Sequence, residues 1–260
     1  CILLHSLKNQ TYKQFDIVIL VDGNGQHPLE TKFVQDIVQR LKLEGHGVQF
    51  LHNKISYGVC KARNRLLEED PWKNNTNFIA RLDDDVILEN SYLEKLMKIM
   101  QLHPDCGISS GITPVLCGPD FKRDTKFLGA IINRIRLNTE GDIIQYNDDC
   151  GYSYLPCPDR VLYAHQFRSN ALIKRELIDK GLRYELGLSP VGFREEAWFS
   201  LRALMMGYKI FVDTQAIAWH GACNSGGCRY PNYPQLVQSD DQLFRQWVKK
   251  NKDKLKQALK

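Results

Sequence analysis

Short apolar segments that end in aspartate constrain the fold of this 260-residue chain more than any other feature. Residues 15–21 are rich in Ile and Val and run directly into Asp22-Gly23. Residues 77–82 run in the same way into Asp83-Asp84-Asp85. Short apolar runs of this kind are typical of buried parallel strands, and the turn residues that follow mark where each strand ends. The sequence therefore predicts at least two buried strands with acidic side chains at their carboxyl ends.

Helical periodicity alternates with these strands. Apolar residues recur with helical spacing in residues 29–43 and 58–69, and residues 1–9 also favour a helix. Asn90 or Ser91 is a suitable cap for a helix that ends near residue 100, and residues 48–51 form another short strand. This alternation predicts an α/β fold with a doubly wound, mostly parallel sheet and helices on both faces. Ligands of such sheets lie beyond the carboxyl ends of the strands, where Asp22 and Asp83–Asp85 are expected.

The second half of the chain is less regular. Residues 113–165 are rich in Gly, Pro and Asp, with apolar runs at 127–132 and 161–163, and predict a second, smaller lobe on the same sheet edge. Helices are expected at 171–180 and 195–206, strands at 209–212 and 216–219, and a last helix capped by Ser239-Asp240. We expect three parts, at 1–112, 113–230 and 231–260, of which the last is a helical tail.

Composition excludes several classes of protein. The chain is 43% hydrophobic, which is far from the composition of disordered proteins. Its net charge of +5, from 35 basic and 30 acidic residues, is too small to indicate a nucleic-acid partner. The eight cysteines form no Cys-x-x-Cys pair, which favours reduced thiols in a protein of the cytoplasm or of its membrane face. Cys150 with Cys157 and Cys223 with Cys228 would instead close small loops in an oxidising compartment. No apolar run is long enough to span a membrane, so membrane association is expected only through a segment upstream of residue 1.

The acidic triplet predicts a cation site. Three adjacent carboxylates repel one another and are costly to hold together without a cation. In an extended chain Asp83 and Asp85 point the same way, so the two side chains can share one divalent ion, whose other ligands are typically substrate phosphates. A solvated acidic turn is the alternative interpretation.

Three further groups of residues are candidates for chemistry. Asn53 and Gly58 lie in the segment that leads into a basic helix, and this helix contains Arg63. The amino terminus of a helix is a favourable place for an anion. Glu195-Glu196 lie at the start of a helix beside Trp198, where one carboxylate can act as a general base or simply complement the helix dipole. His220 follows the last expected strand, and a lone histidine is more often structural.

Taken in order, these motifs resemble the inverting nucleotide-sugar transferases of family 2, which have the GT-A fold. The resemblance extends from residue 1 to about residue 222. It is carried by Asn9-Gln10-Thr11-Tyr12, by Asp22-Gly23, by Gly58 with Ala62-Arg63-Asn64, by Asp83-x-Asp85, by Glu195-Glu196, and by His220. The chain departs from the family in having Val21-Asp22 where two acids are usual, and in having Glu196 where Asp is usual.

The resemblance implies a role for each motif. Asp22 would contact the nucleobase, and Asn53, Gly58, Arg63, Asp83 and Asp84 would lie beside the nucleotide. Asp83, Asp85 and His220 would hold Mn²⁺ or Mg²⁺. Glu196 would be the catalytic base, with Glu195 as the alternative. The resemblance also implies that 1–112 is the half that binds the nucleotide sugar and that 113–230 is the acceptor and catalytic half.

The implied reaction is transfer of a sugar, with inversion, from a nucleotide-diphosphate donor (a UDP-sugar is expected) to a hydroxyl of a glycan or other acceptor. The Gln-x-x-Arg-Trp phrase of processive synthases is missing, which favours transfer of one sugar at a time. A nucleotidyltransferase that makes sugar nucleotides, or a non-catalytic module that binds nucleotide sugars or glycans, are the alternatives.

Overall fold

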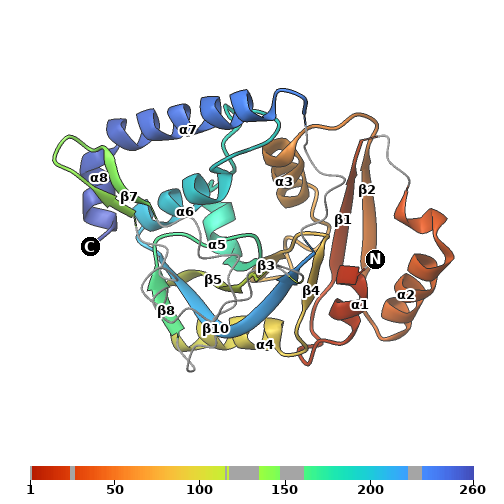
Figure 1. Ribbon diagram of the computed structural model, residues 1–260. Helices are drawn as coiled ribbons and strands as arrows, with labels where there is room; N and C mark the ends of the chain where they lie inside the picture. The colour runs from red at the N-terminus through yellow and green to blue at the C-terminus, as the bar shows by residue number, and fades with distance from the viewer. Residues whose placement is uncertain (1, 24–26, 115, 117–134, 147–160, 222–229) are drawn as a thin grey trace.

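The computed structural model describes residues 2–23, 27–114, 116, 135–146, 161–221 and 230–260. At one side of the molecule, β1 (Ile17–Asp22) pairs in parallel with β2 (Val48–Asn53), and this register places Asp22 opposite Asn53. The 3-10 turn Pro28–Glu30 and helix α2 (Lys32–Leu43) connect the two strands, and α1 (Ile2–Lys8) packs against α2 (Figure 1). Helix α3 (Val59–Glu68) follows β2 and lies beside β1. The carboxyl ends of β1 and β2 therefore lie at the same edge of this two-stranded sheet.

The second sheet has the order β3-β9-β5-β10-β4, with β8 also paired to β10. Its strands are β3 (Phe78–Arg81), β4 (Val86–Leu88), β5 (Cys106–Ile112), β8 (Val161–Ala164), β9 (Ala171–Lys174) and β10 (Lys209–His220). Strands β5 and β10 are parallel, whereas β9 runs antiparallel between β3 and β5. Strands β3, β5 and β10 consequently share one direction, and β4, β8 and β9 run against it. A short hairpin of β6 (Ile135–Leu137) and β7 (Ile143–Tyr146) forms a separate pair.

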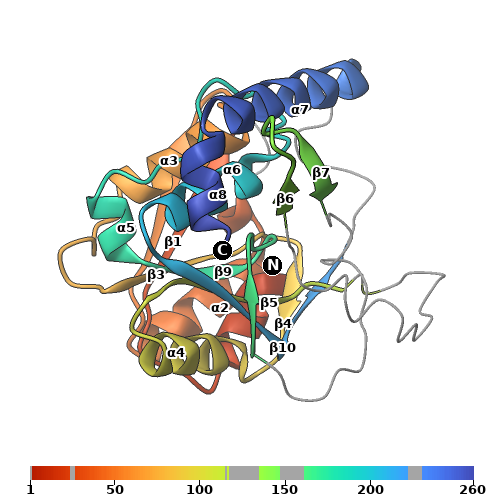
Figure 2. The same ribbon diagram turned by 90° about the vertical axis from the view of Figure 1, so that its left-hand side faces the viewer.

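Helices cover both faces of this sheet. Helix α4 (Tyr92–Leu102) packs on one face, and α5 (Arg175–Asp179) and α6 (Glu195–Met205) lie on the other (Figures 1 and 2). Helices α7 (Tyr233–Lys250) and α8 (Lys252–Ala258) form an outer layer over α6. The α/β architecture with helices on both faces, as expected of the GT-A type, is therefore confirmed.

Two apolar clusters form the core. One joins α1, α2 and α4 to β1 and β4, with Leu41 and Leu96 fully buried. The other joins α6, α7 and α8 to β5, β9 and β10, with Phe199, Phe244 and Val248 fully buried. The expected tail at 231–260 thus shares an apolar cluster with α6, and the division into 1–112, 113–230 and 231–260 stays a prediction.

Three expectations for secondary structure were wrong. The helix expected at 171–180 is strand β9 followed by the short helix α5, because Ala171, Leu172 and Ile173 are buried between neighbouring strands and tertiary packing decides their conformation. The strands expected at 209–212 and 216–219 form the single strand β10. Helix α7 begins at Tyr233, so Ser239-Asp240 lie inside it and do not cap it. The apolar run 127–132 lies outside the described residues.

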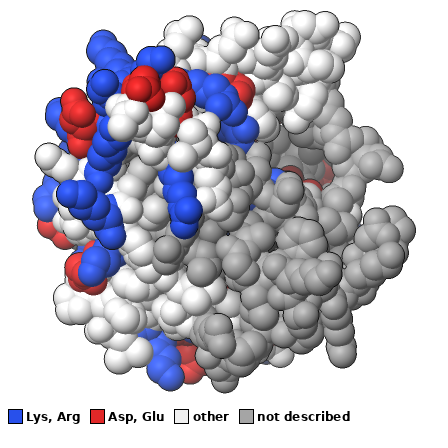
Figure 3. All heavy atoms as spheres, turned by 60° about the vertical axis from the view of Figure 1, so that its left-hand side comes forward, with Lys and Arg blue, Asp and Glu red and all other residues white. Residues whose placement is uncertain are grey.

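The face formed by α7 and α8 is charged. Lys249, Lys250 and Lys254 are exposed on these helices, and Lys249 Nζ lies 3.1 Å from Asp142 Oδ1. Figure 3 shows basic and acidic side chains interspersed on this side of the molecule. Within the described residues, no helix combines the length and the apolar character needed to cross a lipid bilayer.

Candidate active site

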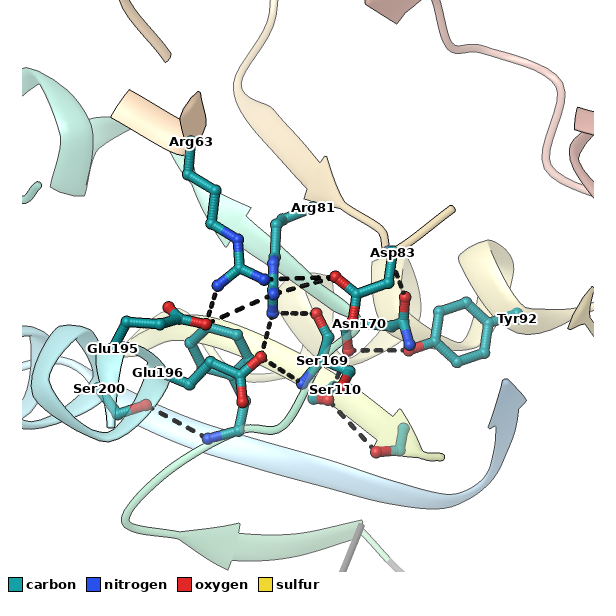
Figure 4. A network of polar contacts seen from close by, with 12 residues as sticks. Arg63, Arg81, Asp83, Tyr92, Ser110, Ser169, Asn170, Glu195, Glu196 and Ser200 are labelled. Carbon is teal, nitrogen blue, oxygen red and sulfur yellow. Dashed lines mark hydrogen bonds and ion pairs between the residues drawn. The ribbon is translucent and has the colours of Figure 1, made fainter. Parts of the chain in front are cut away.

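Arg81, the last residue of β3, lies at the centre of a buried network of charges (Figure 4). Its Nη1 atom is 2.5 Å from Oε1 of Glu196, and its Nη2 atom is 3.1 Å from Oδ1 of Asp83 and 3.6 Å from Oε1 of Glu195. Arg63 of α3 joins the network through its ion pair with Glu195 and a 3.4 Å contact with Asp83. Two guanidinium groups therefore face three carboxylates that come from two distant parts of the chain.

Burial and opposite charge act against each other at Arg81. Burial alone lowers the pKa of its guanidinium, but the carboxylates of Asp83 and Glu196 raise this pKa by more, so the net shift is upward. Arg81 stays charged although its side chain is only 10% exposed. Removing one partner from such a network would leave the others as uncompensated buried charges.

The two glutamates at the start of α6 differ in accessibility. The side chain of Glu195 is 7% exposed, whereas that of Glu196 is 21% exposed. The backbone N–H of Ser169 donates to Oε1 of Glu196 at 2.8 Å, the same oxygen that Arg81 contacts. Ser169 holds a positive φ of 55°, a conformation that directs this N–H toward the carboxylate. Among the described residues, no hydrogen bond engages Oε2 of Glu196, which leaves this oxygen available to a proton donor.

Asn170 fixes the backbone at the acidic triplet. Its Oδ1 atom accepts a hydrogen bond from the N–H of Asp83 at 3.0 Å. Its carbonyl accepts hydrogen bonds from Ser110 Oγ at 2.6 Å and from Tyr92 Oη at 2.9 Å (Figure 4). Burial raises the pKa of the Tyr92 phenol, which keeps this donor protonated. The segment that precedes β9 thereby sets the positions of both Asp83 and Glu196.

Asp22, at the end of β1, organises a loop between β2 and α3. Its carboxylate accepts hydrogen bonds from Ser56 Oγ at 2.8 Å, from Tyr57 N at 3.0 Å and from Gly58 N at 3.3 Å, and it also contacts Asn53 Nδ2. Burial raises the pKa of Asp22, but these hydrogen bonds together outweigh burial, so the pKa is lowered overall. The predicted nucleotide residues Asp22, Asn53 and Gly58 are thus brought together.

Asp85 and His220 meet across the antiparallel pair of β4 and β10. Oδ2 of Asp85 lies 3.3 Å from Nε2 of His220, and the N–H of Gly221 donates to the carbonyl of Asp85 at 2.7 Å. Burial raises the pKa of Asp85, His220 opposes this shift, and the carboxylates of Asp83 and Asp84 add to it. The pair is partly accessible, with side-chain exposures of 34% for Asp85 and 17% for His220.

Comparison with known proteins identifies the family of this chain. The family model described as "Glycosyl transferase family 2" matches residues 2–182. The chain belongs to glycosyl transferase family 2. Glu195, Glu196 and His220 lie beyond the matched part of this family 2 member, so the match does not extend to them. No curated protein matches the chain.

Solved structures support the GT-A fold of this family 2 member. The crystal structure of GalNAc-T7 with UDP, GalNAc and Mn²⁺ is similar, with a TM-score of 0.63 at 16% identity, over 91% of this chain and 44% of that one. The mannosyltransferase PcManGT from Pyrobaculum calidifontis, in complex with GDP-Man and Mn²⁺, has a TM-score of 0.53 at 13% identity, over 98% of this chain and 68% of that one. The chain therefore spans less than half the length of the GalNAc-T7 structure.

The structure separates some residues that the sequence placed together. Asp83 and Asp85 were expected to share one ion, but the carboxylate of Asp83 faces Arg63 and Arg81, whereas that of Asp85 faces His220. Asp84 is exposed. Within the described part of the chain, no group of three or more His, Cys, Asp or Glu side chains could hold a metal ion. The structure thus brings Asp85 and His220 together and places the Asp83 carboxylate beside the two arginines, and the ligand set of Asp83, Asp85 and His220 stays a prediction.

Sequence reasoning missed Arg81, Ser169 and Asn170. Arg81 offered one signal, because an arginine at the end of a buried strand and two residues before Asp83 is rarely a solvated surface residue. Ser169 and Asn170 offered none, since their contribution depends on β9 lying between β3 and β5.

Two of the hollows that the described residues form differ in where they lie relative to the candidate site. The smaller, of about 650 Å³, is bordered by Asn53, Tyr57 and Arg65 and adjoins the loop that Asp22 holds. The larger, of about 1070 Å³, is bordered by Asn77, Phe78 and Arg175, at the opposite end of β3 from Arg81. We associate only the smaller one with the candidate site, because the larger contains none of the predicted residues.

Proposed function

We propose that the chain transfers one sugar at a time, with inversion, from a nucleoside-diphosphate sugar to an acceptor hydroxyl, and that UDP is the nucleotide. The observation that carries this proposal is the position of Arg81, which contacts Asp83 at 3.1 Å and Glu196 at 2.5 Å. These contacts hold the acids that follow β3 beside the acids that begin α6. Donor and acceptor chemistry can therefore share one site.

The nucleotide is proposed to lie along the carboxyl ends of β1 and β2. Asp22 and Asn53 occupy these strand ends, and Gly58 begins α3 with its N–H directed toward Asp22. Arg63, one turn further along α3, and Asp83 and Asp84 after β3 are proposed to complete the nucleotide site. The two structural neighbours were solved with UDP and with GDP-Man, so both nucleotides belong in the test of the donor.

The residues present fit a divalent cation. Asp85, the residue before β4, supplies an oxygen donor, and His220, at the end of β10, supplies a nitrogen donor. Carboxylate oxygens suit Mn²⁺ and Mg²⁺, whereas an imidazole nitrogen favours a transition-metal ion, so we propose Mn²⁺ for this pair. Sites that bind nucleotide phosphates typically need only one or two protein ligands, because the phosphates supply others. Asp83 remains a proposed third ligand, and Mg²⁺ remains an alternative ion. When bound, the ion would neutralise negative charge on the leaving diphosphate.

Glu196 is proposed as the general base. Oε2 of its carboxylate would take the proton of the acceptor hydroxyl while the hydroxyl oxygen attacks the anomeric carbon from the face opposite the diphosphate. One carbon–oxygen bond forms as the bond from sugar to diphosphate breaks, and the nucleoside diphosphate leaves with the bonding electrons. Arg81 and Ser169 hold Oε1, so the carboxylate is oriented before the acceptor arrives. Glu195, buried against Arg63, is the alternative base.

A panel of UDP- and GDP-sugars, incubated with Mn²⁺, with Mg²⁺ or with no metal, tests the proposal through release of the nucleoside diphosphate. Metal-dependent release of UDP from at least one donor supports it. Release of pyrophosphate from a nucleoside triphosphate and a sugar phosphate would instead indicate a nucleotidyltransferase. Donor binding without turnover for every sugar and acceptor tried would indicate a binding module.

A further inference from the structure

Asp240, in the middle of α7, is buried and bonds a loop far away in the sequence. The residue is 2% exposed. Its Oδ1 atom accepts a hydrogen bond from Ser189 N at 2.7 Å, and its Oδ2 atom accepts hydrogen bonds from Ser189 Oγ at 2.8 Å and from Phe193 N at 2.9 Å. The carboxylate therefore spans both ends of the segment 189–193, which leads into α6.

This arrangement is costly unless the carboxylate is well bonded. A buried ionised carboxylate loses its hydration, and only hydrogen bonds or opposite charge compensate for the loss. All three donors to Asp240 come from the segment 189–193, and two of them are backbone N–H groups. The bonds of Asp240 thus fix the course of the main chain in this segment.

The opposite side of the same segment rests on α3. The N–H of Val59 donates to the carbonyl of Pro190 at 2.9 Å. Gly58 has a φ of +78°, and a Cβ atom at this position would lie 2.6 Å from Cα of Pro190. Gly192 has a φ of +68°, and a Cβ atom there would lie 3.0 Å from Cβ of Val59. The segment is thus enclosed between α7 and the amino terminus of α3.

The enclosed segment ends directly at the acids of the site. The N–H of Glu195 donates to the carbonyl of Gly192 at 3.0 Å, and Arg194, with a φ of +72°, precedes α6. Oδ1 of Asp241, the neighbour of Asp240 on α7, lies 2.8 Å from Nε of Arg194. A shift of the segment would therefore move the first turn of α6, where Glu195 and Glu196 lie.

We propose that Asp240 is a positioning residue for the acids of α6, acting through the main chain of residues 189–193. This inference rests on the proposed function, because the contact matters for turnover only if Glu196 is the general base. Asp240 and residues 189–193 both lie outside residues 2–182, the part that the family model matches.

The test compares Asp240→Asn with Val248→Ala, a control in the same helix. Val248 is fully buried in α7 and bonds no part of the segment, so its truncation loosens the helix without affecting the hydrogen bonds of Asp240. In Asp240→Asn, the side-chain NH₂ replaces one of the two acceptor oxygens. It then faces a backbone N–H of the segment, donor against donor, and that hydrogen bond is lost. We expect kcat with the best donor of the panel to fall at least about tenfold, with an unchanged KM for that donor. Amide hydrogen exchange in residues 189–194 should be faster than in Val248→Ala.

A milder variant, Ser189→Ala, removes only the hydroxyl bond and should show a smaller loss of kcat in the same direction, even where Asp240→Asn fails to fold. A kcat that falls no further in the Asp240 and Ser189 variants than in Val248→Ala would overturn the inference. Unchanged exchange in residues 189–194 would overturn it as well. The exchange measurement needs no turnover, so it separates failure of this inference from failure of the proposed function, which would appear as no turnover in the unmodified protein.

Discussion

Nη1 of Arg81 and Oε1 of Glu196 lie 2.5 Å apart, although 115 positions separate the two residues in the chain. The contact joins the end of β3 to the first turn of α6. Because Asp83 also contacts Arg81, one guanidinium group sets the spacing between the acidic triplet and the proposed base. The predictions for Glu195, Glu196 and Arg81 follow from these contacts.

Glu196→Gln should abolish most turnover and leave donor binding intact. The amide keeps the shape of the side chain but cannot accept a proton, and loss of a general base typically costs about 100-fold or more in rate. Initial rates of nucleotide release and donor affinity by calorimetry are the measurements. Weaker donor binding that accounts for the whole loss of rate would contradict the role of a base.

Glu195→Gln is the matched comparison for that variant. Glu195 is 7% exposed and pairs with Arg63, so its substitution should leave a buried guanidinium group with less compensation. We expect a lower free energy of unfolding as the main effect, measured by urea denaturation. If Glu195→Gln lost turnover at full stability while Glu196→Gln stayed active, Glu195 and not Glu196 would be the base.

Arg81→Met should destabilise the fold strongly. The substitution leaves the carboxylates of Asp83 and Glu196 without their shared partner, and breaking a buried charge network in this way costs about 3–5 kcal/mol. Arg40→Met is the control, because Arg40 is 60% exposed and its pair with Glu44, the residue after α2, contributes about 0–1 kcal/mol. Urea unfolding at pH 7 measures both. Equal effects of the two substitutions would show that the network contributes no more than a surface pair.

Asp22 should make stability depend on pH in acid. Its folded pKa is lowered below the ordinary value of 3.8, so its contribution is fully present above this value and is lost as the pH falls through the folded pKa. The stability difference between the unmodified protein and Asp22→Asn should therefore be constant from pH 7 to about pH 5 and shrink below pH 3.8. Asp36→Asn, on the exposed side of α2, controls for loss of a charge. A difference that grows as the pH falls would contradict the assignment.

Gly58→Ala should cost more stability than Gly207→Ala. Both glycines have a positive φ, of 78° and 87°, so both substitutions strain the backbone by about 1 kcal/mol or more. Only at Gly58 would the new Cβ atom also meet a neighbour, 2.6 Å from Cα of Pro190, whereas nothing lies within 4 Å at Gly207. Thermal unfolding of the two variants measures the difference. Equal losses would show that the contact between α3 and Pro190 is not tight in solution.

The sequence predicted the strand ends better than the strand order. Asp22 and Asp83 follow apolar runs whose period and composition reflect burial directly, so their places at the sheet edge could be predicted. Strand β9 could not, because Ala171–Lys174 becomes a strand only through pairing with β3 and β5. The same limit applies to Arg81 and Asp240, whose partners are distant in the sequence and are brought near only by the fold.

The most direct test of the account is nucleotide release from the UDP-sugar panel, measured with and without Mn²⁺, in the unmodified protein, in Asp85→Asn and in Asp36→Asn. Oδ2 of Asp85 lies 3.3 Å from Nε2 of His220, and Asp85 would be a ligand of the ion. Asp36 lies on α2, so Asp36→Asn removes the same charge away from the proposed ion. The account predicts release that requires Mn²⁺, that is lost in Asp85→Asn and that persists in Asp36→Asn. Release that ignores the metal and survives Asp85→Asn would contradict it.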